Sequence, residues 1–134
     1  MKNANIVLCV VVVIHFCVMG GILLSAPSLG QQSFLRETEQ AKLINEKLNG
    51  TLEAKTPDGS RVDILTDEYA YEVDWAYKWP QAIGQSLYYA AATNRKPGII
   101  LLFKNRTEER RYYLRCLVVC NRYNIRLITK DAVR

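Results

Sequence analysis

Histidine and cysteine are scarce in this 134-residue chain. It has one histidine, His15, and four cysteines, of which Cys9 and Cys17 lie with His15 in an apolar run near the start. The other two, Cys116 and Cys120, are too few for a structural zinc site, which takes four ligands. The sequence therefore offers no zinc constellation. We expect Cys116 and Cys120 to be buried free thiols, although an exported chain could carry them as a disulfide.

The start of the chain resembles a targeting segment. Lys2 precedes a 19-residue apolar run at 6–24, and the small residues Ser28 and Gly30 follow it. This is the pattern of a secretory signal peptide over 1–30, which predicts cleavage before Gln31 and export to the periplasm or the medium. The run is also close to the length that spans a bilayer, so a retained membrane anchor at 6–24 is the alternative. No cysteine lies near the cut, which argues against a lipoprotein.

The rest of the chain, 31–134, shows no internal repeat, low-complexity tract or linker, so we expect a single domain. Its charge is uneven. Residues 27–75 hold five Lys or Arg and ten Asp or Glu, whereas 76–134 hold twelve and three. An acidic half followed by a basic half suits a metal site beside a phosphate-binding surface, but ordinary solvated faces would give the same count.

Hydrophobic patterning predicts an α/β fold. Helical spacing runs over 34–48, where Ser33 can cap the start, and 51–56 and 61–66 flank a Pro-Asp-Gly-Ser turn typical of a hairpin. The remaining expected elements are strands at 69–75, 99–103 and 126–130 and helices at 80–94 and 108–123. The order αβββαβαβ implies a mixed central sheet flanked by helices on both faces.

Acidic residues mark the second and third expected strands. Asp63 lies in Arg-Val-Asp, Glu72 lies in Glu-Val-Asp, and the following helix carries Gln85 and Tyr89 four residues apart, hence on one face. This run resembles the PD-(D/E)xK nuclease superfamily, in particular its RecB-like branch with a Gln-xxx-Tyr motif. The resemblance covers nearly all of the chain after the expected signal peptide, from about 35 to 130. It implies a restriction-endonuclease-like core.

The resemblance also implies a reaction. Asp63 and Glu72, with the carbonyl of Val73 as an extra ligand, would hold Mg²⁺ or Mn²⁺ for phosphodiester hydrolysis of DNA or RNA, and Gln85 and Tyr89 would support the site. Mg²⁺ favours oxygen ligands and usually takes one or two carboxylates with waters, so this donor set suits it.

One position departs from the family pattern, because Asp74 stands where the motif has a lysine. Lys78, four residues later, could bring an ammonium group into that place and help to activate water. Asp74 could instead act as a third metal ligand. If neither holds, the site is silent and Lys78 merely pairs with Asp74.

Further candidates surround this core. The superfamily often adds a carboxylate from its first helix, which predicts a role for Glu39 or Glu46. The main functional expectation is an exported Mg²⁺-dependent nuclease; the alternatives are a catalytically silent nucleic-acid- or partner-binding module and a structural domain unrelated to nucleic acid. The candidate phosphate contacts are Arg95, Lys96, Lys104, Arg106, Arg110, Arg111 and Arg115.

Overall fold

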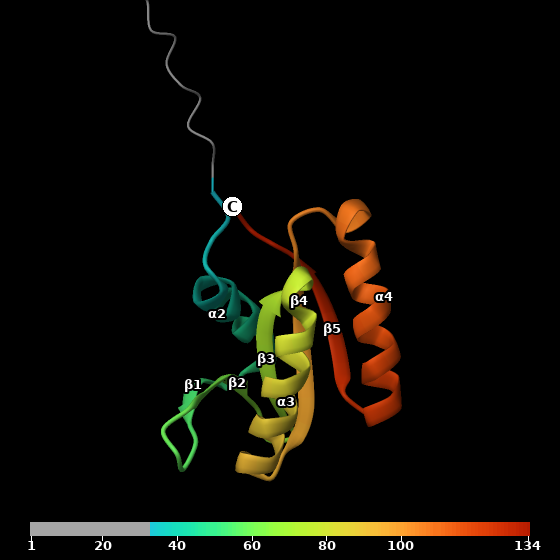
Figure 1. Cartoon of the computed structure of the whole chain (residues 1–134). Coiled ribbons are helices and arrows are strands. Elements are labelled where there is room, and N and C mark those ends of the chain that lie inside the picture. Colours follow the sequence, from blue (N-terminus) through green and yellow to red (C-terminus); the bar gives the residue numbers. More distant parts are fainter. Residues whose placement is uncertain (1–32) are drawn as a thin grey trace, which may run out of the picture. The chain divides into compact units, whose positions relative to one another are not determined.

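The computed structural model describes residues 33–134, so the predicted signal peptide or anchor lies outside the described residues. Within 33–134, no helix combines the length and apolar character needed to cross a membrane. The described elements, in chain order, are α2 (Glu37–Leu48), β1 (Thr51–Lys55), β2 (Arg61–Leu65), β3 (Tyr69–Trp75), a short 3-10 turn η1 (Ala76–Lys78), α3 (Trp79–Thr93), β4 (Lys96–Phe103), α4 (Arg106–Tyr123) and β5 (Arg126–Asp131) (Figure 1).

The strands of the described region form one mixed sheet in the order β1-β2-β3-β4-β5. The first three are antiparallel neighbours, joined by short turns, and the last three are parallel, joined by α3 and α4. Parallel neighbours need a crossover, and each of these two helices supplies one. The predicted α/β class with a mixed sheet and flanking helices is confirmed.

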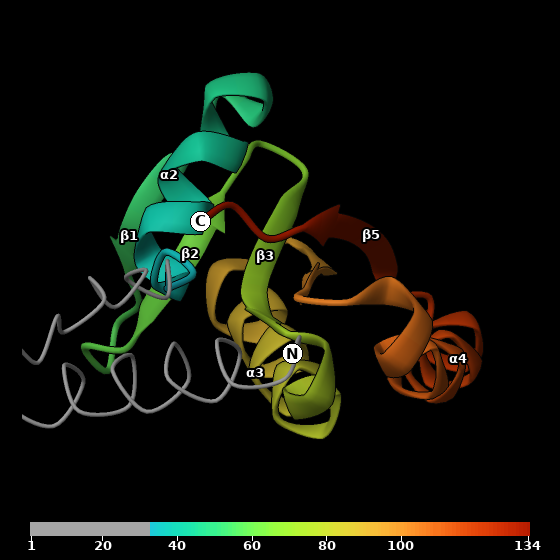
Figure 2. The same ribbon diagram turned by 90° about the horizontal axis from the view of Figure 1, so that it is seen from above.

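Helices cover both faces of the sheet. On one face, Ala82 of α3 and the cysteines of α4 pack against alternate residues of β4. On the other, α2 packs on Tyr71, Val73 and the intervening β4 residues. Viewed from above, α2 and α3 lie on opposite sides of β3 (Figure 2). The alternation along β3 and β4 therefore divides the apolar side chains between two cores.

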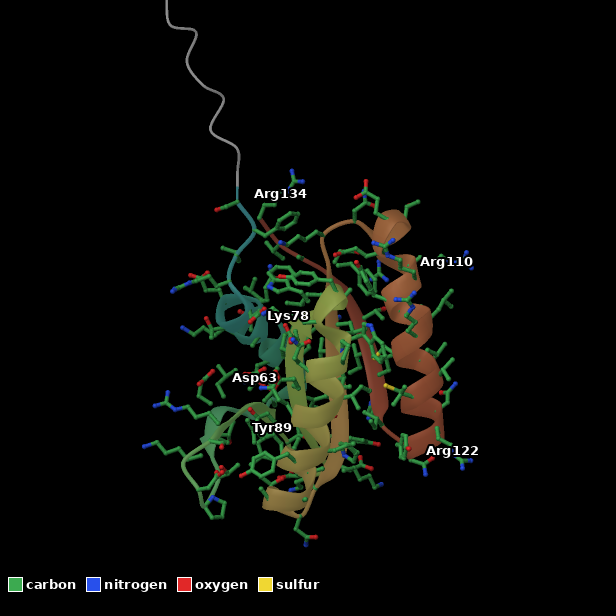
Figure 3. All side chains as sticks on the ribbon, in the orientation of Figure 1. Asp63, Lys78, Tyr89, Arg110, Arg122 and Arg134 are labelled. Atoms are coloured by element: carbon green, nitrogen blue, oxygen red, sulfur yellow. The ribbon has the colours of Figure 1, made fainter. Side chains whose placement is uncertain are left out.

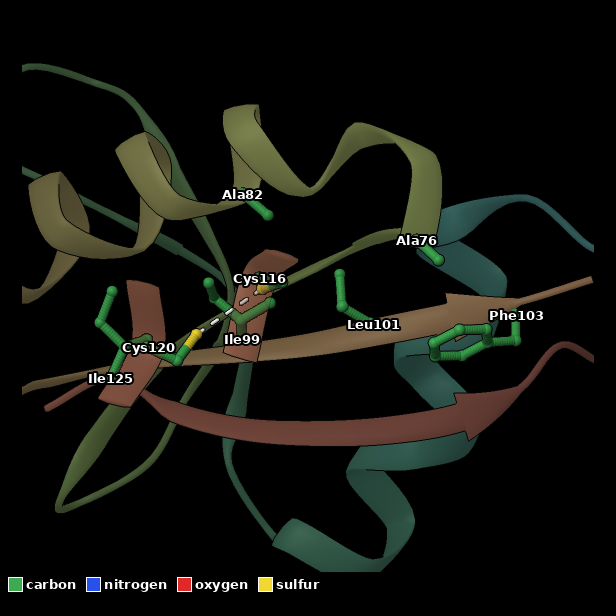
Figure 4. Close-up of a cluster of buried hydrophobic side chains, with 8 residues drawn as sticks. All are labelled: Ala76, Ala82, Ile99, Leu101, Phe103, Cys116, Cys120 and Ile125. Atoms are coloured by element: carbon green, nitrogen blue, oxygen red, sulfur yellow. Dashed lines mark hydrogen bonds between the residues drawn. The ribbon is translucent and has the colours of Figure 1, made fainter. Parts of the chain in front are cut away.

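Cys116 and Cys120 are buried free thiols in α4, as the sequence predicts. Their sulfur atoms lie 3.6 Å apart, which is a hydrogen-bonding separation and not a disulfide (Figure 4). They fill the space between α4 and Ile99, so their described role is packing.

Two element starts differ by three residues from the sequence expectation. The first helix begins at Glu37, and its N-cap is Arg36, not Ser33, because the Glu39 carboxylate accepts from the Arg36 backbone N–H at 2.9 Å. The fourth strand starts at Lys96 rather than 99, where Gly98 lies against the ring of Tyr71. A Cβ at Gly98 would come within 2.4 Å of that ring, so only glycine lets the strand continue there.

Val133, which follows β5, is bonded to α2. Gln40, 2% exposed, donates through Nε2 to the carbonyl of Val133 at 2.8 Å and accepts from the Val133 N–H at 3.1 Å. The backbone N–H of Leu35 also donates to the Val133 carbonyl. These bonds fix the start of α2 against the segment that follows β5.

Candidate functional site

Asp63 and Glu72 are neighbours on adjacent strands. β2 and β3 pair at Ile64 and Tyr71, and the same register puts Asp63 opposite Glu72. Opposed residues of antiparallel strands project from the same face. After this pair the backbone hydrogen bonds between β2 and β3 give way to a side-chain bond, in which the Val73 N–H donates to Oδ2 of Asp63 at 2.8 Å. The two predicted ligands are therefore brought together.

Glu72 and Asp74 project from the face that α3 covers. Their partners on β4 are Ile99 and Leu101, which belong to the apolar core beneath α3 and α4. Glu72 is 6% exposed and Asp74 4% exposed. Within residues 33–134, Oε2 of Glu72 is buried and has no hydrogen-bond partner. Burying a carboxylate oxygen without a hydrogen bond costs free energy, so a ligand that contacts Glu72 would offset this cost.

Lys78 connects Asp74 to the first helix. Its Nζ lies 2.7 Å from Oε1 of Glu37 and 3.4 Å from Oδ1 of Asp74. The hydrogen bond that Lys78 donates to Glu37, followed by the charge of Asp74, raises the pKa of Lys78. The group therefore stays protonated at neutral pH and acts as a fixed ammonium rather than as a proton acceptor. Glu37, Asp63, Glu72 and Asp74 are called the acidic cluster below.

Burial raises the pKa of each carboxyl group on β2 and β3. For Glu72 the value rises to about 9, with the charges of Asp63 and Asp74 adding to the burial. For Asp63 it rises to about 6, because burial outweighs the bond from Val73. The pKa of Asp74 also rises to about 6, again chiefly by burial, with Lys78 opposing the shift. The acidic cluster thus concentrates negative charge that the described protein neutralises only in part.

Gln85 and Tyr89 lie over this region from α3. Nε2 of Gln85 is 3.5 Å from the hydroxyl of Tyr89, so the four-residue spacing does bring them onto one face. Burial raises the pKa of Tyr89, and the charges of Glu72 and Asp63 add to this. Figure 3 shows Lys78, Asp63 and Tyr89 along the same side of the domain.

The donor set fits a cation held by two protein carboxylates. Among residues 33–134, no three side chains of His, Cys, Asp or Glu stand in an arrangement able to hold a metal ion. The idea of Asp74 as a third ligand gains no support from this. Asp63 and Glu72, with the unpartnered oxygen of Glu72, still offer the oxygen chemistry that Mg²⁺ accepts, since it commonly binds through one or two carboxylates.

The basic candidates separate into two groups at opposite ends of β4. Arg95 precedes the strand and Lys96 begins it; Arg95 donates to the Thr66 carbonyl, and Lys96 pairs with Glu68 at 2.8 Å. At the far end, Arg106 pairs with Asp131, and the Arg111 guanidinium lies 4.8 Å from the ring centre of Tyr112. An eight-residue strand is roughly 25 Å long, so these residues do not form one continuous patch. The group at the far end comprises Lys104, Arg106, Arg110 and Arg111, with Arg115 further along α4.

The helix carboxylate at the site is Glu37, which the sequence argument did not select. Glu39 instead bonds Arg36, and Glu46 is exposed. The sequence does contain a signal for Glu37. It lies four residues before the buried Ala41, so both residues fall on the side of α2 that faces the sheet. Helical spacing of the acidic residues from Ala41 identifies Glu37.

The chain is similar to two KilA-N domain-containing proteins of Acanthamoeba polyphaga mimivirus. One is 30% identical over 110 residues, covering 82% of this chain and 42% of the relative. The other is 38% identical over 60 residues, covering 45% of this chain and 17% of the relative. The chain thus spans less than half the length of these curated relatives. No protein-family profile and no solved structure matches it.

Proposed function

We propose that this domain binds nucleic acid and that its acidic cluster holds a divalent cation for phosphodiester hydrolysis. The observation that carries the proposal is the unpartnered, buried Oε2 of Glu72 beside Asp63. The resemblance to the PD-(D/E)xK superfamily supports the same assignment of these two residues.

The charge balance of the acidic cluster favours a bound cation. Asp63 lies opposite Glu72, and within the described structure Lys78 is the cation in contact with the other two carboxylates, Glu37 and Asp74. Burial raises the pKa values of Glu72 and Asp63, and the charge of Asp63 raises that of Glu72 further. A cation between these two groups would favour their charged forms and offset the cost of burying them.

Each residue has a distinct role in the proposed reaction. When bound, Mg²⁺ or Mn²⁺ would supply a Lewis acid that polarises the phosphate and lowers the pKa of water. Asp63 and Glu72 would bind it, with the Val73 carbonyl as a proposed extra ligand. Lys78, held beside the position where the motif has its lysine, would contribute positive charge toward the phosphate. The hydroxyl and amide of Tyr89 and Gln85 would orient the substrate strand.

The second candidate is a nucleic-acid-binding module without catalysis, on which the comparisons bear more directly. The KilA-N domain binds DNA, and both relatives are named for it. The salt bridge between Lys78 and Glu37 also favours this candidate, because it occupies the ammonium that the reaction would use. The two functions share nucleic-acid binding and differ in turnover.

The test combines metal titration with a cleavage assay. Mn²⁺ binding is measured by calorimetry on the wild type, Asp63→Asn and Glu72→Gln, with Glu46→Gln as a matched control because Glu46 is an exposed carboxylate outside the acidic cluster. The same proteins are incubated with labelled single- and double-stranded DNA and RNA in Mg²⁺. We expect binding and turnover in the wild type and in Glu46→Gln, and neither in the two cluster variants.

The outcomes separate the candidates. Salt-dependent nucleic-acid binding without Mn²⁺ binding or turnover would reject the nuclease and retain the silent module. If turnover is present, Lys78→Ala should reduce it while leaving Mn²⁺ binding intact, whereas equal turnover would remove Lys78 from the mechanism. Absence of salt-dependent binding to DNA and RNA would reject both candidates.

A further inference from the structure

A pocket of about 670 Å³ opens at the start of α2. Its polar lining includes Glu37 and Lys104, and its aromatic lining comprises Phe34 and Trp75. The volume lies within the range of ordinary ligand sites. Because Glu37 belongs both to this lining and to the acidic cluster, the two sites are contiguous.

Lys104 is the unusual group of the pocket. Its ammonium lies 4.7 Å from the ring centre of Trp75, 5.8 Å from that of Tyr77 and 5.9 Å from that of Phe34. Among the described residues, it has no carboxylate within salt-bridge distance, unlike Lys78 and Lys96. Cation–π attraction therefore holds an uncompensated positive charge against an aromatic surface.

The aromatic surface is fixed to the strand that carries the acidic cluster. Trp75 follows Asp74 directly, and its backbone N–H donates to Oδ1 of Asp74 at 2.8 Å. Trp75 and Phe34 meet edge to face, with ring centres 6.3 Å apart. Tyr77, 44% exposed, presents its ring beside Lys104. The pocket and the acidic cluster therefore share Glu37 and adjoin at the Asp74–Trp75 step of the chain.

We propose that this pocket and the exposed ring of Tyr77 at its rim, beside Lys104, bind an unpaired nucleotide, with its phosphate on Lys104 and its base against the ring of Tyr77. Aromatic faces stack on any base, and a lysine without a partner supplies the phosphate contact. A base inside a duplex is already stacked and cannot enter, so the proposal selects single-stranded DNA or RNA. It rests on the proposed nucleic-acid binding and adds the strandedness of the substrate and the residues that read it.

The test measures binding without metal, so that cleavage plays no part. Fluorescein-labelled single strands of about 12 nucleotides, of DNA and RNA, are titrated with the protein in EDTA, followed by anisotropy. Duplexes of the same sequence serve as competitors. Lys104→Ala should weaken single-strand binding by about tenfold and lower the slope of log affinity against log salt by about one. Lys47→Ala is the matched control, since Lys47 is exposed in the last turn of α2, about 15 Å along the helix from Glu37.

A second variant isolates stacking. Tyr77→Leu keeps an apolar side chain at an exposed position, so folding should persist, and it should weaken single-strand binding by about tenfold. On an abasic strand of equal length, Tyr77→Leu should bind like the wild type, while Lys104→Ala should still bind more weakly. This difference assigns the base to the ring and the phosphate to the ammonium.

Three results would overturn the proposal: equal effects of Lys104→Ala and Lys47→Ala, a duplex that binds more tightly than the single strand, or no single-strand binding by the wild type. Failure of the catalytic proposal looks different. In that case Lys104 and Tyr77 still control single-strand binding while Mn²⁺ does not bind. Conversely, Mn²⁺ binding and turnover with no effect of Lys104→Ala would reject the pocket and keep the catalytic site.

Discussion

One face of the sheet has two halves that differ in chemistry. Under α4, β4 contributes Ile99 and Leu101, both fully buried, together with Phe103. One strand away, the paired positions on β3 hold Glu72 and Asp74 at nearly the same burial. The first half gains free energy by removing apolar surface from water, and the second loses free energy by removing charge from it.

The difference indicates where the domain derives its stability and where it holds its candidate site. The apolar half is complete in itself, since helices and sulfur atoms fill it. The acidic half keeps an unpartnered oxygen and carboxyl groups of raised pKa. Sites that bind ligands are often built from groups that the empty protein stabilises poorly.

The largest effect should come from the apolar half. Leu101→Ala removes a fully buried side chain from the centre of the sheet, and we expect the free energy of unfolding to fall by roughly 2–5 kcal/mol. Leu114→Ala, at a 44% exposed position of α4, is the matched control and should cost less than about 1 kcal/mol. Urea denaturation at neutral pH measures both. Similar losses in the two variants would show that the apolar half does not dominate stability.

In the acidic half, a substitution that removes a buried carboxyl group should raise the free energy of unfolding instead of lowering it. Glu72 has a pKa raised from 4.5 to about 9, so the folded state binds more protons than the unfolded state between these values. By linkage, the free energy of unfolding then falls as pH rises through that window. Glu72→Gln keeps the shape without the charge and should stabilise the protein in EDTA by roughly 1–3 kcal/mol at about pH 8.

Denaturation in urea from about pH 5 to about pH 9 measures this effect. Glu46→Gln, an exposed change on α2, should leave the pH profile of the wild type unaltered. A Glu72→Gln variant that loses stability at alkaline pH would show that the carboxylate is well stabilised by the folded protein.

The smallest expected effect on stability comes from Lys78, which lies between Glu37 and Asp74. Lys78→Gln removes the cation from Glu37 and Asp74 and should lower the free energy of unfolding by about 1 kcal/mol or less, since the lysine is 36% exposed and partly screened. In the background of Asp74→Asn the loss should shrink, because one of the two carboxylates is gone. Equal losses in both backgrounds would mean that Lys78 acts through Glu37 alone.

The sequence predicts the fold class well because its signals are local. The helical stripe of α2, the turn at Pro57–Gly59 and the apolar run of β4 each determine an element without knowledge of its neighbours. The mixed sheet follows from their order, because a parallel pair needs a crossover helix. The start of α2 was misplaced, since Ser33 and Arg36 compete for the cap and a side-chain contact of Glu39 decides between them.

The candidate site was only partly predictable. Asp63 and Glu72 share a register that any hairpin followed by a third strand would give, so their meeting could be expected. The choice of Glu37 over Glu39 and Glu46 depends on how α2 is rotated on the sheet, which packing against β3 decides. The basic residues are separated because β4 is extended between them. Lys96 and Lys104 are close in the sequence, yet they lie at opposite ends of this strand.

The bonds between Gln40 and Val133 make the acidic cluster sensitive to truncation after β5. They join Val133 to the helix that carries Glu37, and Glu37 contacts Lys78. A truncation before Val133 would therefore keep every described strand, yet it would release the start of α2 and one side of the acidic cluster.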